Sequence, residues 1–220
     1  MMKGTATQSL GEFGPYLAMR PQGRRVQEAL DLKLRQMPPG GVLAVDFDGV
    51  EMMDYSFADE ALGAIYSRMA AREYPDRHLV LLLNEDELGS ALLENIEVAL
   101  NRREVAAIVL PRDEMPDAQA LAARDAHMST HATGAGQEAN ARRALGWRVV
   151  GLLPTHLVDT LRAVMDKGEI TVRELADTLK LDSATACNNR IAKLYQMHLV
   201  RRQAAIVPEG GRQYCYSAVV

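Results

Sequence analysis

The sequence predicts an α/β fold, in which one β-sheet with covering helices is followed by a smaller domain of helices and a β-hairpin. Over the first 110 residues, apolar runs typical of buried strands alternate with amphipathic helical segments. From residue 153 onward the periodicity is helical, with capping signals before the apolar stripes. Near the C-terminus, Pro208-Glu209-Gly210-Gly211 separates two β-prone runs, which is the arrangement of a hairpin.

The first domain is assigned to residues 1–110. Its strands are predicted at Gly14–Met19, Val42–Phe47, His78–Asn84 and Val105–Leu110. Helices are predicted between these strands, at residues 24–36, 56–72 and 85–103. The first helix carries apolar Val26, Leu30, Leu32 and Leu34 among charged residues, and Pro38-Pro39-Gly40-Gly41 stops it. Alternating strands and helices of this kind predict a single sheet covered by helices.

Residues 111–152 are predicted to connect the two domains. Up to residue 146 the segment is dominated by Ala, Asp, Arg, Gly and Thr and has no regular apolar period. His127 and His131 are four residues apart, but no third zinc ligand accompanies them, so we predict no metal site. Trp147–Leu153 is a short apolar stretch that either closes the first domain or opens the second.

The second domain, residues 153–220, is predicted to contain three helices and a hairpin. Thr155 is positioned to cap the first helix, which Gly168 ends. Thr171 and Glu174 have the spacing of a capping box at the start of the second helix.

The third helix is predicted to begin at Asp182 or Ser183. Its apolar face consists of Cys187, Ile191 and Leu194. Cys187 is therefore expected to be a small core residue and not a nucleophile. The two strands of the hairpin are expected at Arg202–Val207 and Gln213–Val219.

The composition is that of an ordinary folded protein. Hydrophobic residues make up 48% of the 220 residues and charged residues 25%, which argues against disorder. No apolar run approaches the length that spans a bilayer, and no signal peptide is recognisable. The two cysteines, Cys187 and Cys215, form neither a disulfide framework nor a metal-ligand spacing. We therefore expect a cytoplasmic protein without a cofactor and without a membrane partner.

The net charge of −4 is unevenly distributed. Residues 1–152 carry sixteen Lys and Arg against twenty-two Asp and Glu, whereas residues 153–220 carry nine against seven. Between Ser183 and Pro208 there is no acid, and the cations there are Arg190, Lys193, Arg201 and Arg202. Local positive charge on an acidic chain indicates one face that meets an anionic partner, such as nucleic acid.

Asp46-Phe47-Asp48-Gly49 resembles the opening motif of haloacid-dehalogenase-type phosphatases, in which one aspartate attacks phosphorus and the other acts as acid and base. Such an enzyme also needs a hydroxyl residue after the next strand, a basic residue and an acidic pair for magnesium. The chain has no lysine between Lys33 and Lys167, and its next strand ends in Asn84-Glu85-Asp86. We therefore expect that the protein is not an enzyme, and a phosphohydrolase using Asp46 and Asp48 is the least favoured alternative.

The segment VLAVDFDGVEMMDYSFADEALG, residues 42–63, resembles the centre of a STAS domain, the module of anti-sigma-factor antagonists. It is most similar to the STAS-like variant with a Ser-Phe-Ala-Asp-Glu run. In antagonists, Asp-Ser-Ser-Gly begins a helix and a partner kinase phosphorylates the second serine. On this pattern Asp54 matches the aspartate and Ser56 the phosphorylated serine, whereas Tyr55 and Phe57 replace the first serine and the glycine.

The resemblance covers about residues 14–110 and implies an input domain that binds a kinase or another regulatory protein. Ser56 and Asp54 are its candidate regulatory residues. A phosphate on a serine at a helix N-terminus is favoured by free N–H groups and by the helix dipole. A purely structural role for Ser56 is the favoured alternative, in which its side chain caps the helix and Asp59 completes a capping-box spacing.

The segment ITVRELADTLKLDSATACNNRIAKLYQMHLVRR, residues 170–202, followed by EGGRQYCY, resembles a winged helix-turn-helix domain of small bacterial regulators. The resemblance implies a positioning helix, a short turn, a recognition helix and a β-hairpin wing. Asp182 stands where an apolar residue is frequent, and His198 stands where glycine is usual.

An inward apolar face on the third helix leaves its polar residues free to meet DNA. The candidates for reading bases or flanking them are Ser183, Thr185, Asn188, Asn189 and Arg190. Asn pairs bidentately with adenine and Arg with guanine in the major groove. Lys193, Arg201 and Arg202 suit phosphates, and Arg212 at the wing tip suits the backbone or the minor groove.

Together these observations predict a transcriptional regulator that joins a STAS-like input domain to a reader of double-stranded DNA. We expect a homodimer, because such readers commonly bind two half-sites. The main alternative is a partner-switching regulator of the antagonist type whose winged helix binds another protein.

Overall fold

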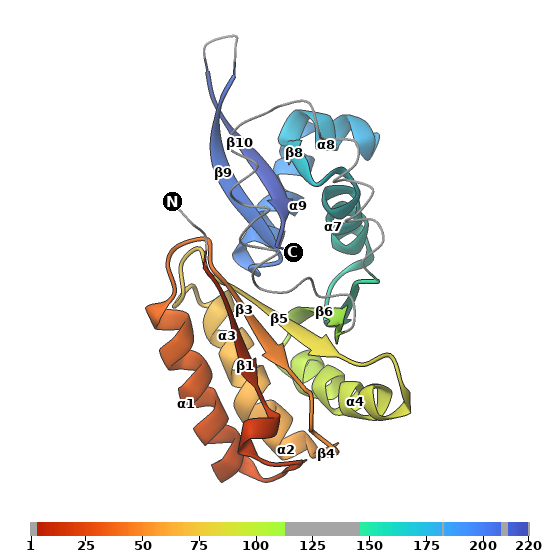
Figure 1. Ribbon diagram of the computed structural model, residues 1–220. Helices are drawn as coiled ribbons and strands as arrows, with labels where there is room; N and C mark the ends of the chain where they lie inside the picture. Colours follow the sequence, from red (N-terminus) through yellow and green to blue (C-terminus); the bar gives the residue numbers. More distant parts are fainter. Residues whose placement is uncertain (1–3, 113–145, 182, 208–210, 220) are drawn as a thin grey trace. The chain divides into compact units, whose positions relative to one another are not determined.

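The computed structural model describes residues 4–112, 146–181, 183–207 and 211–219 of the chain (Figure 1). It divides the chain into two compact units, and each is treated separately below. Unit 1 comprises the described residues up to Leu153, and unit 2 comprises those from Pro154 to Val219.

Unit 1 is built on a five-stranded sheet with the strand order β1-β3-β5-β6-β7. Its strands are β1 (Thr5–Ser9), β3 (Val42–Asp46), β5 (His78–Leu83), β6 (Ala106–Pro111) and β7 (Arg148–Gly151). The first four are parallel, and β7 runs antiparallel to β6. The α/β class with a mostly parallel sheet is therefore confirmed.

The first strand of the sheet differs from the predicted one. Gly14–Met19 contains only the two-residue β2 (Tyr16–Leu17), which follows a 3-10 turn η1 (Gly11–Phe13) and pairs with β4 (Met52–Met53) outside the main sheet. The edge strand of the main sheet is β1, whose sequence TATQS has no large apolar residue and is mostly half-exposed. Trp147–Leu153, for which two roles were open, closes unit 1, because β7 pairs with β6.

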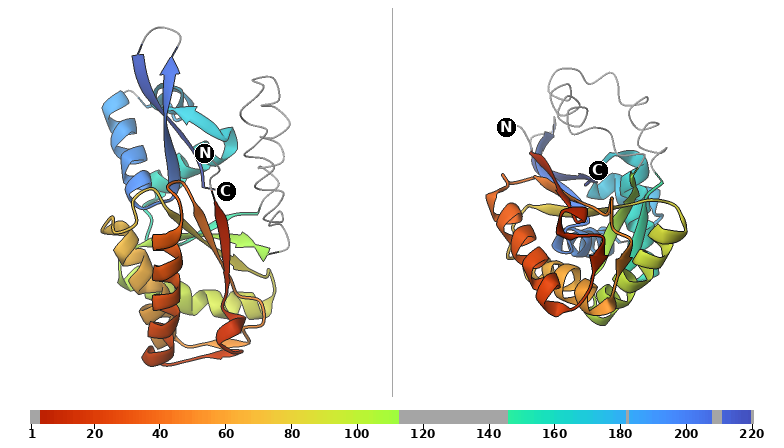
Figure 2. Two further views of the ribbon diagram at one scale, coloured as in Figure 1. Left: turned by 60° about the vertical axis from the view of Figure 1, so that its left-hand side comes forward. Right: turned by 60° about the horizontal axis from the view of Figure 1, so that its bottom comes forward.

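The helices of unit 1 form one layer. They are α1 (Arg20–Gln36), α2 (Tyr55–Ala58), the π-helical turn η2 (Asp59–Gly63), α3 (Ala64–Ala70) and α4 (Glu87–Arg102). Figure 2 shows α1, α2 and α4 on the same face of the strands, as right-handed crossovers between successive parallel strands require. Alternate residues of the strands, such as Leu43, Leu81 and Val109, pack with the buried faces of these helices in the core.

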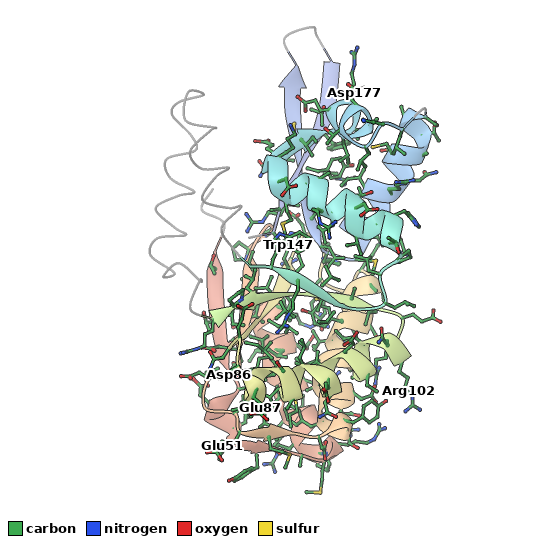
Figure 3. The ribbon with its side chains drawn as sticks, turned by 90° about the vertical axis from the view of Figure 1, so that its right-hand side faces the viewer. Glu51, Asp86, Glu87, Arg102, Trp147 and Asp177 are labelled. Carbon is green, nitrogen blue, oxygen red and sulfur yellow. The ribbon has the colours of Figure 1, made fainter. Side chains whose placement is uncertain are left out.

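Helix α4 has favourable charges at both ends. The carboxylate of Asp86 accepts a hydrogen bond of 2.6 Å from the backbone N–H of Gly89 and so caps the helix. Glu87 lies in the first turn and Arg102 in the last, at opposite ends of the helix in Figure 3. Acidic groups at the N-terminus and basic groups at the C-terminus stabilise a helix through its dipole.

The helix that follows β4 is capped by Asp54 and not by Ser56. The backbone N–H of Phe57 donates to Asp54 Oδ1 at 2.7 Å, and the N–H of Met19 donates to Asp54 Oδ2 at 3.0 Å. The prediction that Ser56 caps this helix is therefore wrong, because the extended residue before the first helical turn is Asp54, two positions earlier. Asp54 also ties the loop before α1 to the start of α2.

Replacing Asp54 by alanine should lower the free energy of unfolding of unit 1 by about 1–2 kcal/mol, because the cap is lost. Ser56→Ala is the matched control. Within the described residues the Ser56 side chain makes no hydrogen bond, so this change should cost no more than about 0.5 kcal/mol. Urea denaturation followed by the fluorescence of Trp147, the single tryptophan of the chain, measures both. Equal losses in the two variants would contradict the assignment of the cap.

The Ser-Phe-Ala-Asp-Glu run is a junction between helices. Phe57 is fully buried, and the buried Asp59 accepts a 2.6 Å hydrogen bond from Arg103 Nε. Glu60 forms ion pairs of 3.3 and 3.2 Å with Arg20 and Arg24 of α1. The run thus joins α1 to the end of α4.

Two glycines allow the close approach at this junction. A Cβ on Gly63 would lie 2.8 Å from Arg103 Cδ. A Cβ on Gly23 of α1 would lie 3.0 Å from the carbonyl oxygen of Phe57. Gly63 therefore leaves room for the Arg103 side chain that binds Asp59, and Gly23 allows α1 to approach the backbone of α2 closely.

Unit 2 contains three helices and a three-stranded antiparallel sheet. The helices are α7 (Thr155–Lys167), α8 (Val172–Thr178) and α9 (Ala184–Gln196). The sheet has the order β8-β10-β9 and consists of β8 (Glu169–Thr171), β9 (Val200–Val207) and β10 (Gly211–Ala218). Strands β9 and β10 form a long hairpin (Figure 1).

The helix starts of unit 2 follow the predicted capping signals in two of three cases. Thr171 and Glu174 form both hydrogen bonds of the capping box at α8. At α9 the Ser183 hydroxyl accepts from Ala186 N–H at 3.3 Å. The predicted cap at Thr155 is wrong, because Thr155 is already the first residue of α7 and the residue before it is Pro154, which has no side-chain acceptor.

His198, just after the end of α9, has a backbone conformation that non-glycine residues rarely adopt. His198 has φ +60°, a left-handed conformation that favours glycine, and its side chain is buried. Its N–H donates to the carbonyl oxygen of Tyr195 and turns the chain from α9 into β9.

The described part of the chain contains neither a candidate membrane span nor a candidate metal site. No helix there has the length and apolar character needed to cross a membrane. No group of three or more His, Cys, Asp or Glu side chains is arranged there to hold a metal ion. His127 and His131 lie outside the described residues.

Candidate nucleic-acid interface

The buried face of α9 fixes which residues of this helix point outward. Cys187, Ile191 and Leu194 are completely buried, as predicted. The Cys187 thiol donates a weak hydrogen bond of 3.5 Å to the carbonyl oxygen of Val172 in α8, and burial raises the pKa of this thiol. Cys187 is therefore a core residue that holds α9 against α8.

The opposite face of α9 is polar and exposed. Thr185, Asn188, Asn189 and Lys193 all lie on the surface, together with the small Ala192. Within the described residues, none of these four polar side chains has a hydrogen bond or an ion pair to another part of the protein. Their donors and acceptors are therefore available to a partner along one stripe of the helix.

The remaining predicted DNA-binding residues lie at the edges of this stripe. Ser183 is exposed at the start of α9, but its hydroxyl is engaged in the cap. Arg190 is half-buried and lies close enough to Cys187 to lower the pKa of its thiol in part. Arg201 is half-buried opposite Ser217, and the next residue, Arg202, is exposed.

Arg212 belongs to β10, where its backbone pairs with Ile206. Its side chain lies outside the described residues, as do Asp182 and residues 208–210. The two regulatory candidates, Asp54 and Ser56, lie in unit 1. Asp54 caps α2, and Ser56 is half-buried in the first turn of the same helix.

No described acidic residue of unit 2 lies on α9 or on the hairpin β9–β10. The described acidic residues lie on α7, β8 and α8, and are Asp159, Asp166, Glu169, Glu174 and Asp177 (Asp177 is labelled in Figure 3). Arg190, Lys193 and Arg202 form no salt bridge to a carboxylate within the described residues. In unit 1, by contrast, Arg20, Arg24 and Arg103 pair with carboxylates. Unpaired cations on one face leave a local positive potential on an acidic chain.

The structure also places three tyrosines around Arg202, which the sequence did not predict. The guanidinium of Arg202 lies over the ring of Tyr195 at 4.3 Å and over the ring of Tyr214 at 4.5 Å from the centroids. Tyr216 is the cross-strand partner of Arg202. Burial raises the pKa of the Tyr216 hydroxyl, and the neighbouring Arg202 lowers it in part. The three rings come from α9 and β10, so only the hairpin register reveals the cluster.

The phosphatase-like motif of unit 1 has a basic partner that the sequence analysis missed. Arg112, directly after β6, pairs with Asp46 at 3.1 Å and with Asp48 at 2.9 Å. Asp46 also accepts a 3.0 Å hydrogen bond from the N–H of Asp48. The parallel strands β3 and β6 end at the same edge of the sheet with only β5 between them, and this brings the residues together. A search for lysine alone does not find such a partner.

Comparisons with known proteins identify no family for this chain. No family model matches the sequence, and no curated protein matches it. One solved structure found as similar is that of the Aeropyrum pernix ORC1 protein in complex with DNA, with 12% sequence identity. The match spans 99% of this chain and 75% of that one, with a TM-score of 0.28. A TM-score of this size does not establish a common fold.

Proposed function

We propose that the chain is a DNA-binding transcriptional regulator in which unit 2 is a winged helix-turn-helix domain. The support for this domain type is the order α7-β8-α8-α9-β9-β10 with the sheet order β8-β10-β9. The turn between α8 and α9 contains Lys180 with φ +51°, which redirects the chain sharply between the two helices. In this proposal α9 is the recognition helix and β9–β10 is the wing.

The observation that carries the proposal is the exposed polar stripe of α9 that contains Lys193, with Arg202 beside the end of the helix; neither of these two cations pairs with a carboxylate in the described residues. Asn188 and Asn189 have the amide groups that pair with adenine in the major groove, and Arg190 has the guanidinium that pairs with guanine. Lys193, Arg201 and Arg202 contact phosphates, which supply most of the affinity. Arg212 contacts the backbone or the minor groove from the wing.

A gel-shift assay with random genomic fragments tests the proposal. We expect a subset of fragments to be retained, with an affinity that falls linearly on a logarithmic salt scale, because binding to phosphates releases counterions. Absence of any shift at low salt would refute DNA binding. That outcome would favour a protein partner for unit 2, as in the partner-switching alternative.

In the same proposal unit 1 is a STAS-like input domain. Its support is the resemblance of residues 42–63 and the position of Ser56 in the first turn of α2. A phosphate on Ser56 would add negative charge close to the Asp54 cap and would change which surfaces can dock there. We expect incubation with cell extract and ATP to add the mass of one phosphate to the wild type but not to Ser56→Ala. Identical masses for the two proteins, after correction for the substitution, would exclude Ser56 as a phosphorylation site.

The regulator is further proposed to be a homodimer that binds two half-sites and is not an enzyme. Light scattering of the purified protein reads the dimer directly, and a monomer at micromolar concentration would contradict it. Asp46 and Asp48 have a structural role here, in which both hold Arg112 at the end of the sheet. A magnesium-dependent phosphatase activity that disappears in Asp46→Asn would contradict this part.

A further inference from the structure

The Arg202 cluster lies on the hairpin face next to the end of α9. Arg202 comes from β9, Tyr214 from β10 and Tyr195 from the last turn of α9. Arg202 pairs across the hairpin with Tyr216, and Tyr214 lies two residues nearer the tip on the same face. Tyr216 is buried, whereas Tyr214 is half-exposed and Arg202 is exposed. The cluster therefore begins in the core and ends at the surface.

The charge of the Arg202 guanidinium is not neutralised by a carboxylate within the described residues, so it can still attract an anion. Arg202 has no carboxylate partner among the described residues, in contrast to Arg103 and Arg112 of unit 1. Its contacts are instead with aromatic rings and with the Tyr216 hydroxyl. A guanidinium that stacks on rings retains N–H donors at its edge, and these donors match the geometry of a phosphate.

Lys193 provides a comparison on the same surface. Its side chain is exposed on α9 and touches no ring within the described residues. A long side chain of this kind must be ordered when it binds a phosphate, which weakens binding. Arg202 is already restrained on two sides by Tyr195 and Tyr214, so less ordering is left for the bound state.

We propose that Tyr195 and Tyr214 are positioning residues, which hold the Arg202 guanidinium ready for a DNA phosphate beside the recognition helix. The inference rests on the proposed function of unit 2. It adds that two tyrosines order one of the phosphate contacts before DNA binds. The tyrosines act through Arg202 and not on the DNA itself. Their effect on DNA binding therefore requires the arginine.

A double-mutant cycle between Arg202 and Tyr214 tests this dependence. The ligand is a duplex fragment retained in the gel-shift assay, and its dissociation constant is measured over a salt series for wild type, Arg202→Ala, Tyr214→Leu and the double variant. Arg202→Ala should lower the slope of log K against log salt by about one. Tyr214→Leu should weaken binding by roughly threefold to tenfold with the slope unchanged. In the Arg202→Ala background, Tyr214→Leu should have no further effect.

Tyr214→Phe is the matched control, because it keeps the ring face and loses only the hydroxyl. Its affinity should equal that of the wild type, and circular dichroism should show all variants folded. Wild-type affinity in Tyr214→Leu would overturn the inference, as would an equal loss in the presence and absence of Arg202. If wild type and variants alike bind no duplex, the proposed function fails and the inference with it. If the wild type binds and Arg202→Ala leaves the slope unchanged, only the inference fails.

Discussion

The double variant Asn188→Ala/Asn189→Ala is expected to lose the preference of the protein for its retained DNA fragments. Both side chains are exposed on α9 without partners in the described part of the chain. A bidentate contact between asparagine and adenine contributes about 1–3 kcal/mol of discrimination. Loss of two such contacts should weaken specific binding by about 30-fold or more. Binding to random DNA should change little, because phosphate contacts remain.

Competition binding between a retained fragment and random DNA measures this loss. Alanine favours helix over asparagine, so α9 itself should not be weakened by the substitutions. Two single variants, each of which removes one cation, show whether the location of the lost charge matters for DNA binding or only the change in net charge. Lys193→Ala removes a cation from the proposed interface, and Arg162→Ala removes one from α7, where it pairs with Asp159 at 3.7 Å. Only Lys193→Ala should lower the salt dependence of binding. A double variant with the wild-type preference would refute base reading by α9.

The second large effect is a loss of stability, which we expect when Asp59 in unit 1 is replaced. Asp59 is 5% exposed, and its carboxylate accepts a 2.6 Å hydrogen bond from Arg103 Nε. The Arg103 side chain is 29% exposed, so it keeps partial access to water when Asp59 is removed. Asp59→Ala should therefore cost mainly the charge-assisted hydrogen bond and lower the free energy of unfolding by about 1.5–3 kcal/mol. Arg24→Ala, which breaks an exposed pair with Glu60 at 3.2 Å, is the control and should cost less than about 1 kcal/mol.

The contribution of Asp59 to the free energy of unfolding should also depend on pH. The hydrogen bond from Arg103 holds the pKa of Asp59 below its ordinary value in the folded protein. Because the folded pKa is the lower one, the ionised carboxylate stabilises unit 1 above about pH 4, the pKa of an unfolded aspartate. This contribution is lost as the pH falls through the folded pKa. Urea denaturation followed by Trp147 fluorescence should show the gap between wild type and Asp59→Asn narrowing in acid. A gap that stays constant from neutral to acid pH would contradict the pairing.

The parts of the fold that could be predicted are those with a strong local signal. Almost every residue of β3, β5 and β6 is buried, and so their sequences are continuous apolar runs. Helix α9 has apolar residues at the correct spacing and a serine cap. Strand β1 has neither signal, because an edge strand with few buried side chains needs no large apolar residues.

The parts of the site that could not be predicted depend on contacts between distant segments. The outward face of α9 follows from its own sequence, but the Arg202 cluster follows from the register of β9 against β10. The pairing of Arg112 with Asp46 requires the order of strands in the sheet. At Ser56 the local pattern was misleading, because two acceptors near the helix start compete and Asp54 also binds the N–H of Met19.

The position of β7 in the sheet affects where the chain can be truncated without exposing a strand edge. It also affects when the sheet is completed during synthesis. β7 covers the open edge of β6, yet it follows β6 in the sequence only after residues 112–147. During synthesis, more than thirty further residues must therefore be added after β6 before β7 can pair with its edge. A fragment that stops before residue 148 would keep that edge bare and open to pairing between molecules, which is a common origin of aggregation. A fragment that ends at Leu153 would carry its own protection.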